Sequence, residues 1–409
     1  MSIAVIGGGA AGMMAAAQAL ELGAEVTLYE PNRLLGKKLR ITGKGRCNLT
    51  NNCPPEEILK NVISNAKFLY SSVYKFTPEE TMAYFEGLGV PLKTERGRRV
   101  FPQSDRAADV SEALEKYITS LGCNIARERV LSRLTKNGKA TGVRTASGDS
   151  HHDAVILATG GVSYPGTGST GDGHRMAREL GIAVTPLKPS LVPVILSENT
   201  APLMGLSLKN VCLSLFLGDK CITRELGEML FTHFGVSGPL VLSASAHMQA
   251  SPVSSYRMEI DLKPALDEET LDRRLIGDLT KYAGRDFVNS LGDLLPAKLI
   301  DEIVRRSGID PRKKSGAVTK AERHALLETL KHFRLTPKAF RSLDEAVVTA
   351  GGIDVSEISP ATMMSKKLPG LFFAGEIIDV DAYTGGYNLQ IAWSTGRKAG
   401  EAAAYYTFE

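Results

Sequence analysis

The first thirty residues, MSIAVIGGGAAGMMAAAQALELGAEVTLYE (1–30), decide the fold. Apolar residues at 3–6 predict a strand that runs directly into a glycine-rich turn, and the alanine-rich segment 10–22 predicts a helix. A second strand is predicted at 25–29, and it ends on the acidic residue Glu30. Strand, glycine turn, helix and strand in this order predict a Rossmann-type α/β fold with a parallel sheet.

The glycines of this turn have the spacing G-x-G-x-x-G. Gly7 allows the tight turn, Gly9 lets a pyrophosphate approach the backbone, and Gly12 lets the helix pack closely on the strand. The helix N-terminus offers N–H groups and a positive dipole end to phosphates. Glu30 would accept hydrogen bonds from a ribose diol. The acid argues against a 2′-phosphate at this position, but it does not separate NAD from FAD.

Composition narrows the class of protein. The chain has 409 residues, which predicts two or three domains, and 43% of its residues are hydrophobic and 23% charged. A formal net charge of +4 gives no strong reason to expect a nucleic-acid or membrane partner. The five cysteines are scattered without metal-binding spacing, so we expect reduced thiols, no metal site and a cytoplasmic protein. The oligomeric state stays open.

Three further segments suit one extended ligand. The loop LLGKKLRITGKGRCNLTNNC (34–53) lacks hydrophobic periodicity and is rich in glycine, small polar and basic residues. A strand predicted at 154–158 ends in Thr-Gly-Gly, and a strand at 371–374 leads into Gly375 and Glu376. The chain then passes through GGYN (385–388) into a predicted helix.

These segments favour FAD over NAD as the ligand. The start of the chain offers an ADP site, and its end offers an acid for a sugar-alcohol chain followed by a helix N-terminus for an electron-rich ring. The helix predicted at 389–405 would place its positive end near the flavin and stabilise the reduced ring.

Several stretches together resemble the BaiN-like, or aminoacetone-oxidase-like, bacterial family of FAD-binding oxidoreductases. They are GGGAAGMMAA, LGKKLRITGKGRCNLTN, ERGRRVFPQS, ATGGVSYPGTGSTGDGHRMARELG, FTHFGVSGP, TAGGIDV and AGEIIDVDAYTGGYNLQIAWSTG, which lie between residues 7 and 397. The resemblance implies a glutathione-reductase-like FAD domain interrupted by a barrel-like and a helical insertion. The ATGG and TGDGH stretches are also similar to fumarate-reductase-type flavoproteins, a more distant relation.

The resemblance also implies a set of FAD contacts. Pyrophosphate contacts would come from Gly7, Gly9, Ala11 and Gly12, and the adenosine ribose contact from Glu30. Residues along the pyrophosphate and flavin would be Lys38, Thr42, Gly43, Gly45, Arg46, Cys47 and Asn48. Residues on the adenine side would be Thr159 and Gly160, and those at the ribityl chain Gly375 and Glu376. Residues at the isoalloxazine would be Gly386, Tyr387, Asn388 and Gln390.

The predicted organisation is a discontinuous FAD domain with a large insertion. The FAD domain covers 1–189 and 346–409, a β-rich domain covers 190–262 and 320–345, and a helical subdomain covers 263–319. Within the FAD domain, the sequence predicts helices at 55–66, at 78–88 with Thr77 as N-cap, and at 105–121 with Ser104 as N-cap. It also predicts a hairpin over KTERGRRVF. Strands predicted at 123–127, 129–135 and 140–145 would form an antiparallel set.

Several motifs admit a structural interpretation beside the functional one. GTGSTG (166–171) repeats the glycine spacing, but no strand precedes it directly, which favours a loop over a second dinucleotide fold. Cys47 is a redox thiol or, more simply, a small packed residue. His233 is a proton donor over the flavin or a structural histidine in a turn. Tyr387 and its neighbour Tyr383 contact substrate or pack.

The sequence therefore predicts an FAD-dependent oxidoreductase that takes hydride from NAD(P)H, a transient donor, and reduces a small unsaturated or carbonyl acceptor. His233 and Tyr387 are its candidate catalytic residues. The arginines of ERGRR could hold a carboxylate, or form a solvated hairpin tip. Two alternatives remain, an FAD-binding protein with a sensing or assembly role and an RNA-modifying flavoprotein. The even spread of charge counts against the latter.

Overall fold

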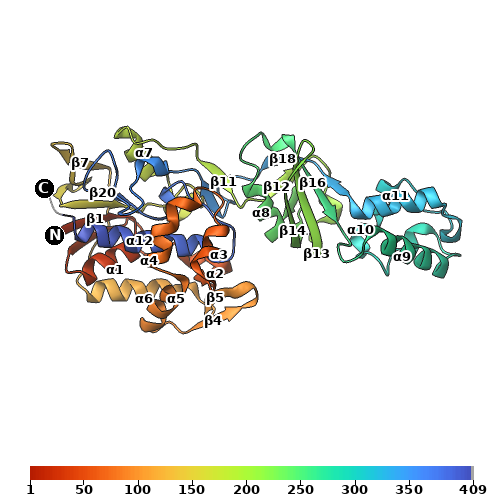
Figure 1. Cartoon of the computed structure of the whole chain (residues 1–409), viewed down its shortest axis with the longest axis horizontal. Coiled ribbons are helices and arrows are strands. Elements are labelled where there is room, and N and C mark those ends of the chain that lie inside the picture. The colour runs from red at the N-terminus through yellow and green to blue at the C-terminus, as the bar shows by residue number, and fades with distance from the viewer. Residues whose placement is uncertain (407–409) are drawn as a thin grey trace. The chain divides into compact units, whose positions relative to one another are not determined.

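The chain folds into two compact units in a computed structural model that describes residues 1–406. The first unit comprises Met1–Ser190 and the chain from Leu343 onward, and the second comprises Leu191–Ser342 (Figure 1). The chain leaves the first unit once and returns to it, so both ends of the sequence contribute to a single fold.

A five-stranded parallel sheet forms the centre of the first unit, in the order β20-β10-β1-β2-β6. Its strands are β1 (Ser2–Ile6), β2 (Glu25–Tyr29), β6 (Asn124–Ala126), β10 (Ala154–Leu157) and β20 (Leu371–Phe373). All residues of β10 and of the edge strand β20 are buried, so both faces of the sheet are covered at this side. Because parallel strands end at one edge, the loops that follow β1, β2, β10 and β20 meet there, and the Rossmann-type α/β prediction is confirmed.

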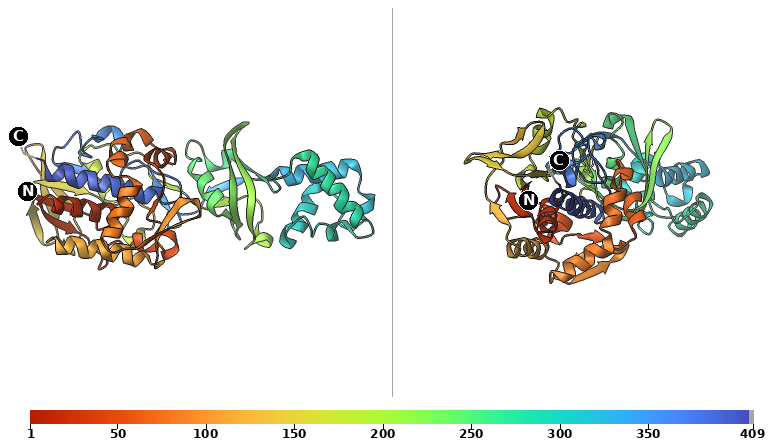
Figure 2. Two further views of the ribbon diagram at one scale, coloured as in Figure 1. Left: turned by 60° about the horizontal axis from the view of Figure 1, so that its bottom comes forward. Right: turned by 60° about the vertical axis from the view of Figure 1, so that its left-hand side comes forward.

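Two helices from opposite ends of the sequence lie side by side in this unit (Figures 1 and 2). They are α1 (Ala10–Glu21) and α12 (Tyr387–Ala404). A Cβ at Gly396 would lie 2.4 Å from the Ala11 carbonyl oxygen, and one at Gly400 would lie 2.2 Å from that of Ala15. The backbones of the two helices are therefore in direct contact, which only glycine permits.

Smaller elements surround the sheet. The helices are α2 (Thr42–Gly45), α3 (Pro55–Lys60), α4 (Tyr70–Lys75), α5 (Pro78–Gly87), α6 (Ala107–Ser120) and α7 (Asp172–Glu179). The strands are β3 (Thr50–Asn51), β4 (Leu92–Glu95), β5 (Arg99–Pro102), β7 (Ser132–Lys136), β8 (Lys139–Thr145), β9 (Gly148–His151), β11 (Lys188–Ser190) and β19 (Val348–Ala350). The predicted hairpin is confirmed as β4–β5, and Thr77 caps α5 in a capping box with Glu80.

Three local predictions are wrong. The helix predicted at 55–66 is too long, because α3 covers only Pro55–Lys60. The predicted strand 123–127 does not join the antiparallel set, because β6 pairs in parallel with β2 and extends the central sheet, while β7, β8 and β9 form the antiparallel set. Ser104 does not cap α6, whose N-cap residue is Arg106. Asp105 lies between them with φ 56, a left-handed conformation that turns its carboxylate toward Arg46 and Lys93 and delays the start of the helix.

The second unit has its own hydrophobic core, around a seven-stranded antiparallel sheet in the order β17-β16-β13-β14-β15-β12-β18. Its strands are β12 (Val194–Leu196), β13 (Ser207–Leu217), β14 (Lys220–Phe231), β15 (Gly235–Ser237), β16 (Tyr256–Asp261), β17 (Phe333–Leu335) and β18 (Pro337–Phe340). Its helices are α8 (Pro239–Ala246), α9 (Glu268–Lys281), α10 (Ala297–Ser307) and α11 (Lys320–Lys331). Only Thr336 separates the edge strands β17 and β18, so the sheet curls until its edges approach each other, as in a barrel.

The contact between α1 and α12 predicts a large effect of a small substitution. Gly396→Ala should destabilise the first unit by about 1–3 kcal/mol, because overpacking outweighs the gain of about 1 kcal/mol that alanine brings to a helix interior. The single tryptophan, Trp393, is fully buried in α12, so its fluorescence during urea unfolding reports on this unit.

Gly277→Ala in α9 is the matched control, since no atom lies within 4 Å of the added Cβ. This substitution should leave the urea midpoint of the Trp393 fluorescence transition unchanged. Equal effects of the two substitutions would contradict the proposed backbone contact.

Candidate flavin site

The turn between β1 and α1 forms an open cradle. Gly7 has φ 106, and a Cβ there would lie 2.5 Å from the Ala158 carbonyl oxygen, so the turn packs tightly on the neighbouring strand. At Gly9, by contrast, nothing lies within 4 Å of a Cβ position. No side chain among residues 1–406 caps α1, and its first turn, which contains Ala11 and Gly12, carries no acid. Open space before uncapped N–H groups is what a pyrophosphate requires.

Glu30 lies at the end of β2 against this turn. Its Oε2 accepts a hydrogen bond from the Gly8 N–H at 2.9 Å, and its Oε1 accepts from the Asn32 N–H at 2.9 Å and from Asn32 Nδ2 at 2.7 Å. The carboxylate is thereby held beside the glycine turn, where a ribose diol would reach it. Asn32 was not singled out from the sequence, although its place two residues after the strand-ending acid is a usable signal.

The loop after β10 carries an unpaired buried hydroxyl. Thr159 Oγ1 is buried and has no hydrogen-bond partner among residues 1–406, and Gly160 follows with φ 71. A Cβ at Gly173 would lie 2.2 Å from this oxygen. Because buried hydroxyls in folded proteins are normally paired, an orphan at the ligand-binding edge of the sheet fits a site that a cofactor completes.

Lys38 and Glu376, both predicted as FAD contacts, lie 338 positions apart in the sequence. They form an ion pair at the edge of the sheet where the parallel strands end. The Lys38 Nζ donates to Glu376 Oε2 at 2.6 Å and to Ser163 Oγ at 2.6 Å. Glu376 Oε1 accepts from Ser163 Oγ at 3.0 Å and from the Thr349 N–H at 2.9 Å. Burial favours a higher pKa for Glu376, but Lys38 and these donors outweigh it and hold the pKa below its ordinary value.

The segment 42–48 has an irregular backbone. Thr42 Oγ1 donates to the Leu39 carbonyl, Gly43 has φ 57, and Gly45 has nothing within 4 Å of a Cβ position. The Arg46 side chain contacts Glu95 and Asp105 on and beside the hairpin and lies 4.2 Å above the Phe101 ring.

Cys47, in the same segment, is fully buried. Burial raises the pKa of its thiol to about 12, which removes the thiolate that redox chemistry needs. The packed interpretation of Cys47 is therefore the one that its surroundings favour.

Three amide side chains shape the start of α12. Gly386 is its N-cap with φ 99, and Asn48, with its amide turned to suit its neighbours, accepts from the Gly386 N–H at 3.0 Å. Gln390 is fully buried and accepts from Thr50 Oγ1 at 2.6 Å. Asn388 Oδ1 accepts a hydrogen bond from the Ala382 N–H, and Asn388 Nδ2 donates one to the Ala382 carbonyl. Contacts of these side chains with a flavin ring stay predictions.

Tyr387 is half-buried in the first turn of α12. Burial, together with the nearby Cys53 and Glu57, raises the pKa of its hydroxyl to about 12, so it carries its proton at neutral pH. Gly375 lies in the turn that follows β20. It has φ 76 and donates its N–H to Thr395 Oγ1 of α12 at 3.0 Å.

His233 belongs to the second unit, in the loop between β14 and β15, where its ring meets Phe234 edge-on with centroids 5.0 Å apart. Its predicted role as a proton donor stays a prediction. A different histidine, His174, is fully buried in the first unit, and its Nε2 lies 3.0 Å from the Ile377 carbonyl oxygen. Burial lowers the pKa of His174. His174 is the last residue of the stretch TGDGH, which was the sequence signal for this histidine.

No group of three or more His, Cys, Asp or Glu side chains in residues 1–406 is placed to hold a metal ion. Within the same residues, no helix combines the length and apolar character needed to cross a bilayer. The short 3₁₀ turn Pro165–Thr167 overlaps the start of segment 166–171, no strand leads into it, and α7 follows.

The parallel sheet, the glycine cradle, the strand-ending acid and the second helix N-terminus define a flavoprotein with a Rossmann-type FAD-binding fold. The model of the family described as HI0933-like protein Rossmann domain matches residues 1–402. The chain belongs to this family of FAD-binding oxidoreductases, which includes BaiN-like reductases, and the resemblance predicted from the sequence is confirmed.

Two curated relatives are similar over almost the whole chain. The first is the 3-dehydro-bile acid delta(4,6)-reductase of Clostridium scindens, 31% identical over 406 residues, with 98% of each chain covered. The second is the ribosomal RNA dihydrouridine synthase of Haemophilus influenzae, 32% identical over 399 residues, with 96% of this chain and 95% of the relative covered. The second name leaves the expectation of no nucleic-acid partner without support.

Solved structures share the fold. The 3-ketosteroid delta1-dehydrogenase of Sterolibacterium denitrificans aligns with a TM-score of 0.53 at 12% identity, covering 98% of this chain and 99% of the other. The 3-ketosteroid-delta4-(5alpha)-dehydrogenase of Rhodococcus jostii aligns with a TM-score of 0.51 at 15% identity, covering 99% and 96%. At this identity the likeness establishes the fold alone.

The Lys38–Glu376 pair predicts a pH-dependent stability effect. Lys38→Met should cost about 2 kcal/mol of unfolding free energy at pH 7, because it leaves a partly buried carboxylate without its cation. The folded-state pKa of Glu376 lies below its ordinary value, so its stabilising contribution is present above about pH 4.3 and is lost as the pH falls through the folded pKa. The deficit of the variant should therefore shrink in acid.

Urea titrations followed by Trp393 fluorescence at pH 7 and at decreasing pH test this effect. Lys60→Met, which removes an exposed lysine paired with Glu57, is the control and should change little. A deficit that is independent of pH would contradict the assignment to Glu376.

Proposed function

We propose that the protein is an FAD-dependent reductase that saturates a carbon–carbon double bond conjugated with a carbonyl group, with NAD(P)H as the hydride donor. The names of both relatives describe this chemistry, on a bile acid in one case and on uridine in the other. The observation that carries the proposal is the half-buried side chain of Tyr387 in the first turn of α12, next to the turn at which a flavin ring is predicted.

FAD, when bound, supplies the hydride chemistry, and the protein contributes binding, orientation and proton management. The uncapped start of α1 and Glu30 would hold the adenosine end. The turn at Gly375 and the start of α12 would hold the ring end. Burial raises the pKa of the Tyr387 hydroxyl, so it is protonated at neutral pH and can donate a hydrogen bond or a proton to a carbonyl-conjugated acceptor.

Anaerobic stopped-flow spectroscopy tests the proposal. NADH or NADPH should bleach the flavin absorbance, and a 4-en-3-one steroid should restore it, whereas the corresponding saturated 3-ketone should not. Tyr387→Phe should keep its flavin and slow the restoration about 10²-fold or more, as expected for loss of a general acid. The exposed Tyr70→Phe is the control.

Two outcomes would count against this function. If neither nucleotide bleaches the flavin, a sensing or assembly role without turnover gains support. If the saturated ketone reoxidises the flavin as fast as the unsaturated one, the proposed acceptor class is wrong.

One observation favours a nucleobase in RNA as a second candidate acceptor. The tip of the β4–β5 hairpin carries Arg96, Arg98 and Arg99, none of which forms an ion pair with a carboxylate among residues 1–406. Asn51 Nδ2 donates to the Gly97 carbonyl at 3.0 Å and to the Gly385 carbonyl at 3.0 Å, so the tip is tied to the loop before α12.

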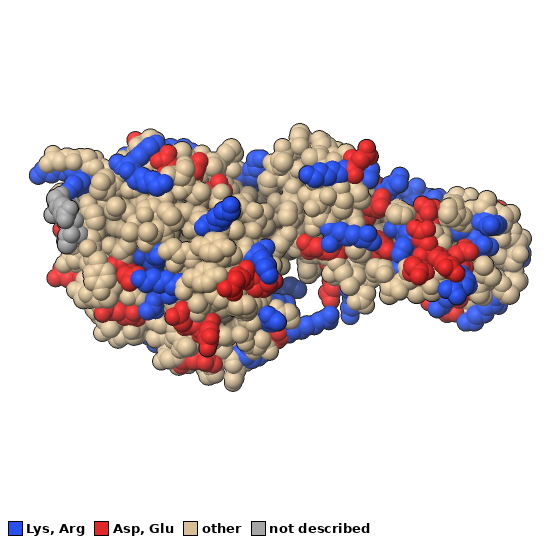
Figure 3. Space-filling model, viewed as in Figure 1, with Lys and Arg blue, Asp and Glu red and all other residues tan. Residues whose placement is uncertain are grey.

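Figure 3 shows basic and acidic side chains interspersed over most of the face that it draws. Three guanidinium groups without a carboxylate partner in residues 1–406, beside the predicted ring end, would contact phosphates next to a reacting base.

The arginines predict a measurable salt dependence. Replacing Arg96 and Arg98 with glutamine should weaken binding of a ribosomal RNA fragment and lower the slope of log affinity against log salt by about one for each phosphate that the variant no longer neutralises. Arg144→Gln is the control, because Arg144 already pairs with Asp149. An unchanged slope in the double variant would exclude the hairpin as an RNA-binding element.

A further inference from the structure

Part of strand β13 in the second unit has an open edge. The neighbouring strand β16 ends at Asp261, which lies opposite Cys212 of β13. The chain then turns away from β13, and the Leu262 N–H donates to the Leu330 carbonyl of α11. Residues 207–211 at the start of β13 therefore have β14 on one side and, within residues 1–406, no strand on the other. No loop replaces the missing strand either, because no further backbone hydrogen bond reaches residues 207–211 in the described chain.

The open edge lines a groove together with the start of α10, and both elements are marked in Figure 1. Leu295, Pro296 and Leu299 lie on the α10 side, and Leu262 and Lys263 after β16 complete the lining. The three leucines are buried, so the inner surface of the groove is apolar. The groove thus combines an unpaired strand edge with an apolar surface, which are the two features that an added strand requires.

The charge around this groove is positive. Lys209 is exposed on the open edge. Lys263 Nζ donates to the Leu294 carbonyl at 2.5 Å. Lys298 lies in the first turn of α10, and its Nζ donates to the Met204 carbonyl at 2.9 Å. None of the three lysines forms an ion pair with a carboxylate in residues 1–406, and no acidic residue lines the groove. Carbonyl groups leave this positive charge without a counter-charge.

We propose that the groove binds an extended, acidic peptide segment of a partner protein, which adds to β13 as a further strand. An open strand edge presents alternating N–H and C=O groups, and a second peptide backbone can pair with both. The segment would lie beside residues 207–211, in the place that β16 leaves. Apolar side chains of the segment would contact Leu295 and Leu299, and acidic ones would pair with Lys209 and Lys263.

Two other occupants fit the groove less well. A second copy of this chain, paired antiparallel through the same edge, would centre on Lys209 and place like charges opposite each other, which is destabilising. An RNA backbone would neutralise the lysines, but it lacks the regular alternation of donors and acceptors that a strand edge pairs with. Complementarity of charge and backbone therefore favours the acidic peptide.

Fluorescence anisotropy of the FAD-loaded full chain with a labelled model peptide tests the proposal. The probe is a peptide of alternating glutamate and valine, about eight residues long, which matches the length of a strand. Replacing its glutamates with lysine should weaken binding about tenfold or more, and so should methylation of its alternate backbone nitrogens, which blocks strand pairing. The combined variant Lys209→Gln and Lys263→Gln should weaken binding of the unmodified probe to a similar extent.

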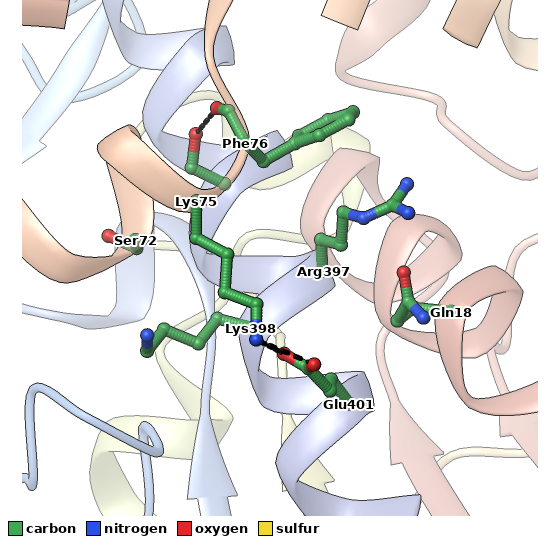
Figure 4. A pocket seen from close by; sticks show the side chains of 8 residues that line it. Gln18, Ser72, Lys75, Phe76, Arg397, Lys398 and Glu401 are labelled. Atoms are coloured by element: carbon green, nitrogen blue, oxygen red, sulfur yellow. Dashed lines mark hydrogen bonds and ion pairs between the residues drawn. The ribbon is translucent and has the colours of Figure 1, made fainter. Parts of the chain in front are cut away.

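Lys75→Gln is the matched control for the loss of a lysine. Lys75 lies in a different pocket, between α1, α4 and α12 of the first unit, where Figure 4 shows it extending toward Glu401. Its Nζ donates to Glu401 Oε1 at 2.6 Å, so its charge is already paired. This variant should bind the probe as the unaltered protein does.

Several results would overturn the proposal. They are equal binding of the glutamate and lysine peptides, equal binding of the methylated peptide, tighter binding of oligouridylate that is lost in the lysine variant, and a dimer that the same variant dissociates. Should the variant fail to fold, hydrogen exchange of the unaltered protein decides. Added probe should slow exchange of the amides in residues 207–211, and protection found only elsewhere would contradict the site. None of the predicted FAD contacts lies in the second unit, so this outcome is independent of the proposed function.

Discussion

The direct contact between the backbones of α1 and α12 is the constraint on which the rest of the structure depends. Gly396 and Gly400 let α12 approach until its residues touch the carbonyl groups of Ala11 and Ala15. The first helix carries the turn predicted to bind the pyrophosphate, and the last carries the N-terminus predicted to face the flavin ring. A cofactor longer than either site can bind only because these two elements are fixed against each other.

This constraint explains why many polar side chains near the site form hydrogen bonds with the backbone around the start of α12. Asn51, Asn388 and Gln390 all direct their amide groups to loop carbonyls, loop N–H groups or neighbouring hydroxyls. A helix that begins after glycine has few side chains of its own to fix its start, and amides from distant segments fix it instead. Residues that resemble ring contacts in the sequence are therefore, in the folded chain, also the supports of the α12 N-terminus.

The parts of the structure that could be predicted are those specified by local patterns. The strand, turn and helix of residues 1–30 and the capping box at Thr77 follow from periodicity, glycine spacing and short-range hydrogen bonds. Partners that lie far apart in the sequence could not be predicted. Ser163 follows β10, and Thr349 lies in β19 of a separate two-stranded sheet, so these residues meet Glu376 only in the folded chain. β6 joins the parallel sheet through pairing that no local signal specifies.

The division of charge at this edge suggests where substrates are distinguished. The Lys38–Glu376 pair neutralises itself, and Cys47 stays protonated, so the cradle presents mainly backbone groups and neutral donors. Such a cradle serves FAD equally well whatever the acceptor. The unpaired charge lies instead at the Arg96–Arg99 tip, tied by Asn51 to the loop before α12. We therefore expect acceptors to be distinguished at this hairpin, whose charge is not neutralised, and not in the cradle predicted to hold the cofactor.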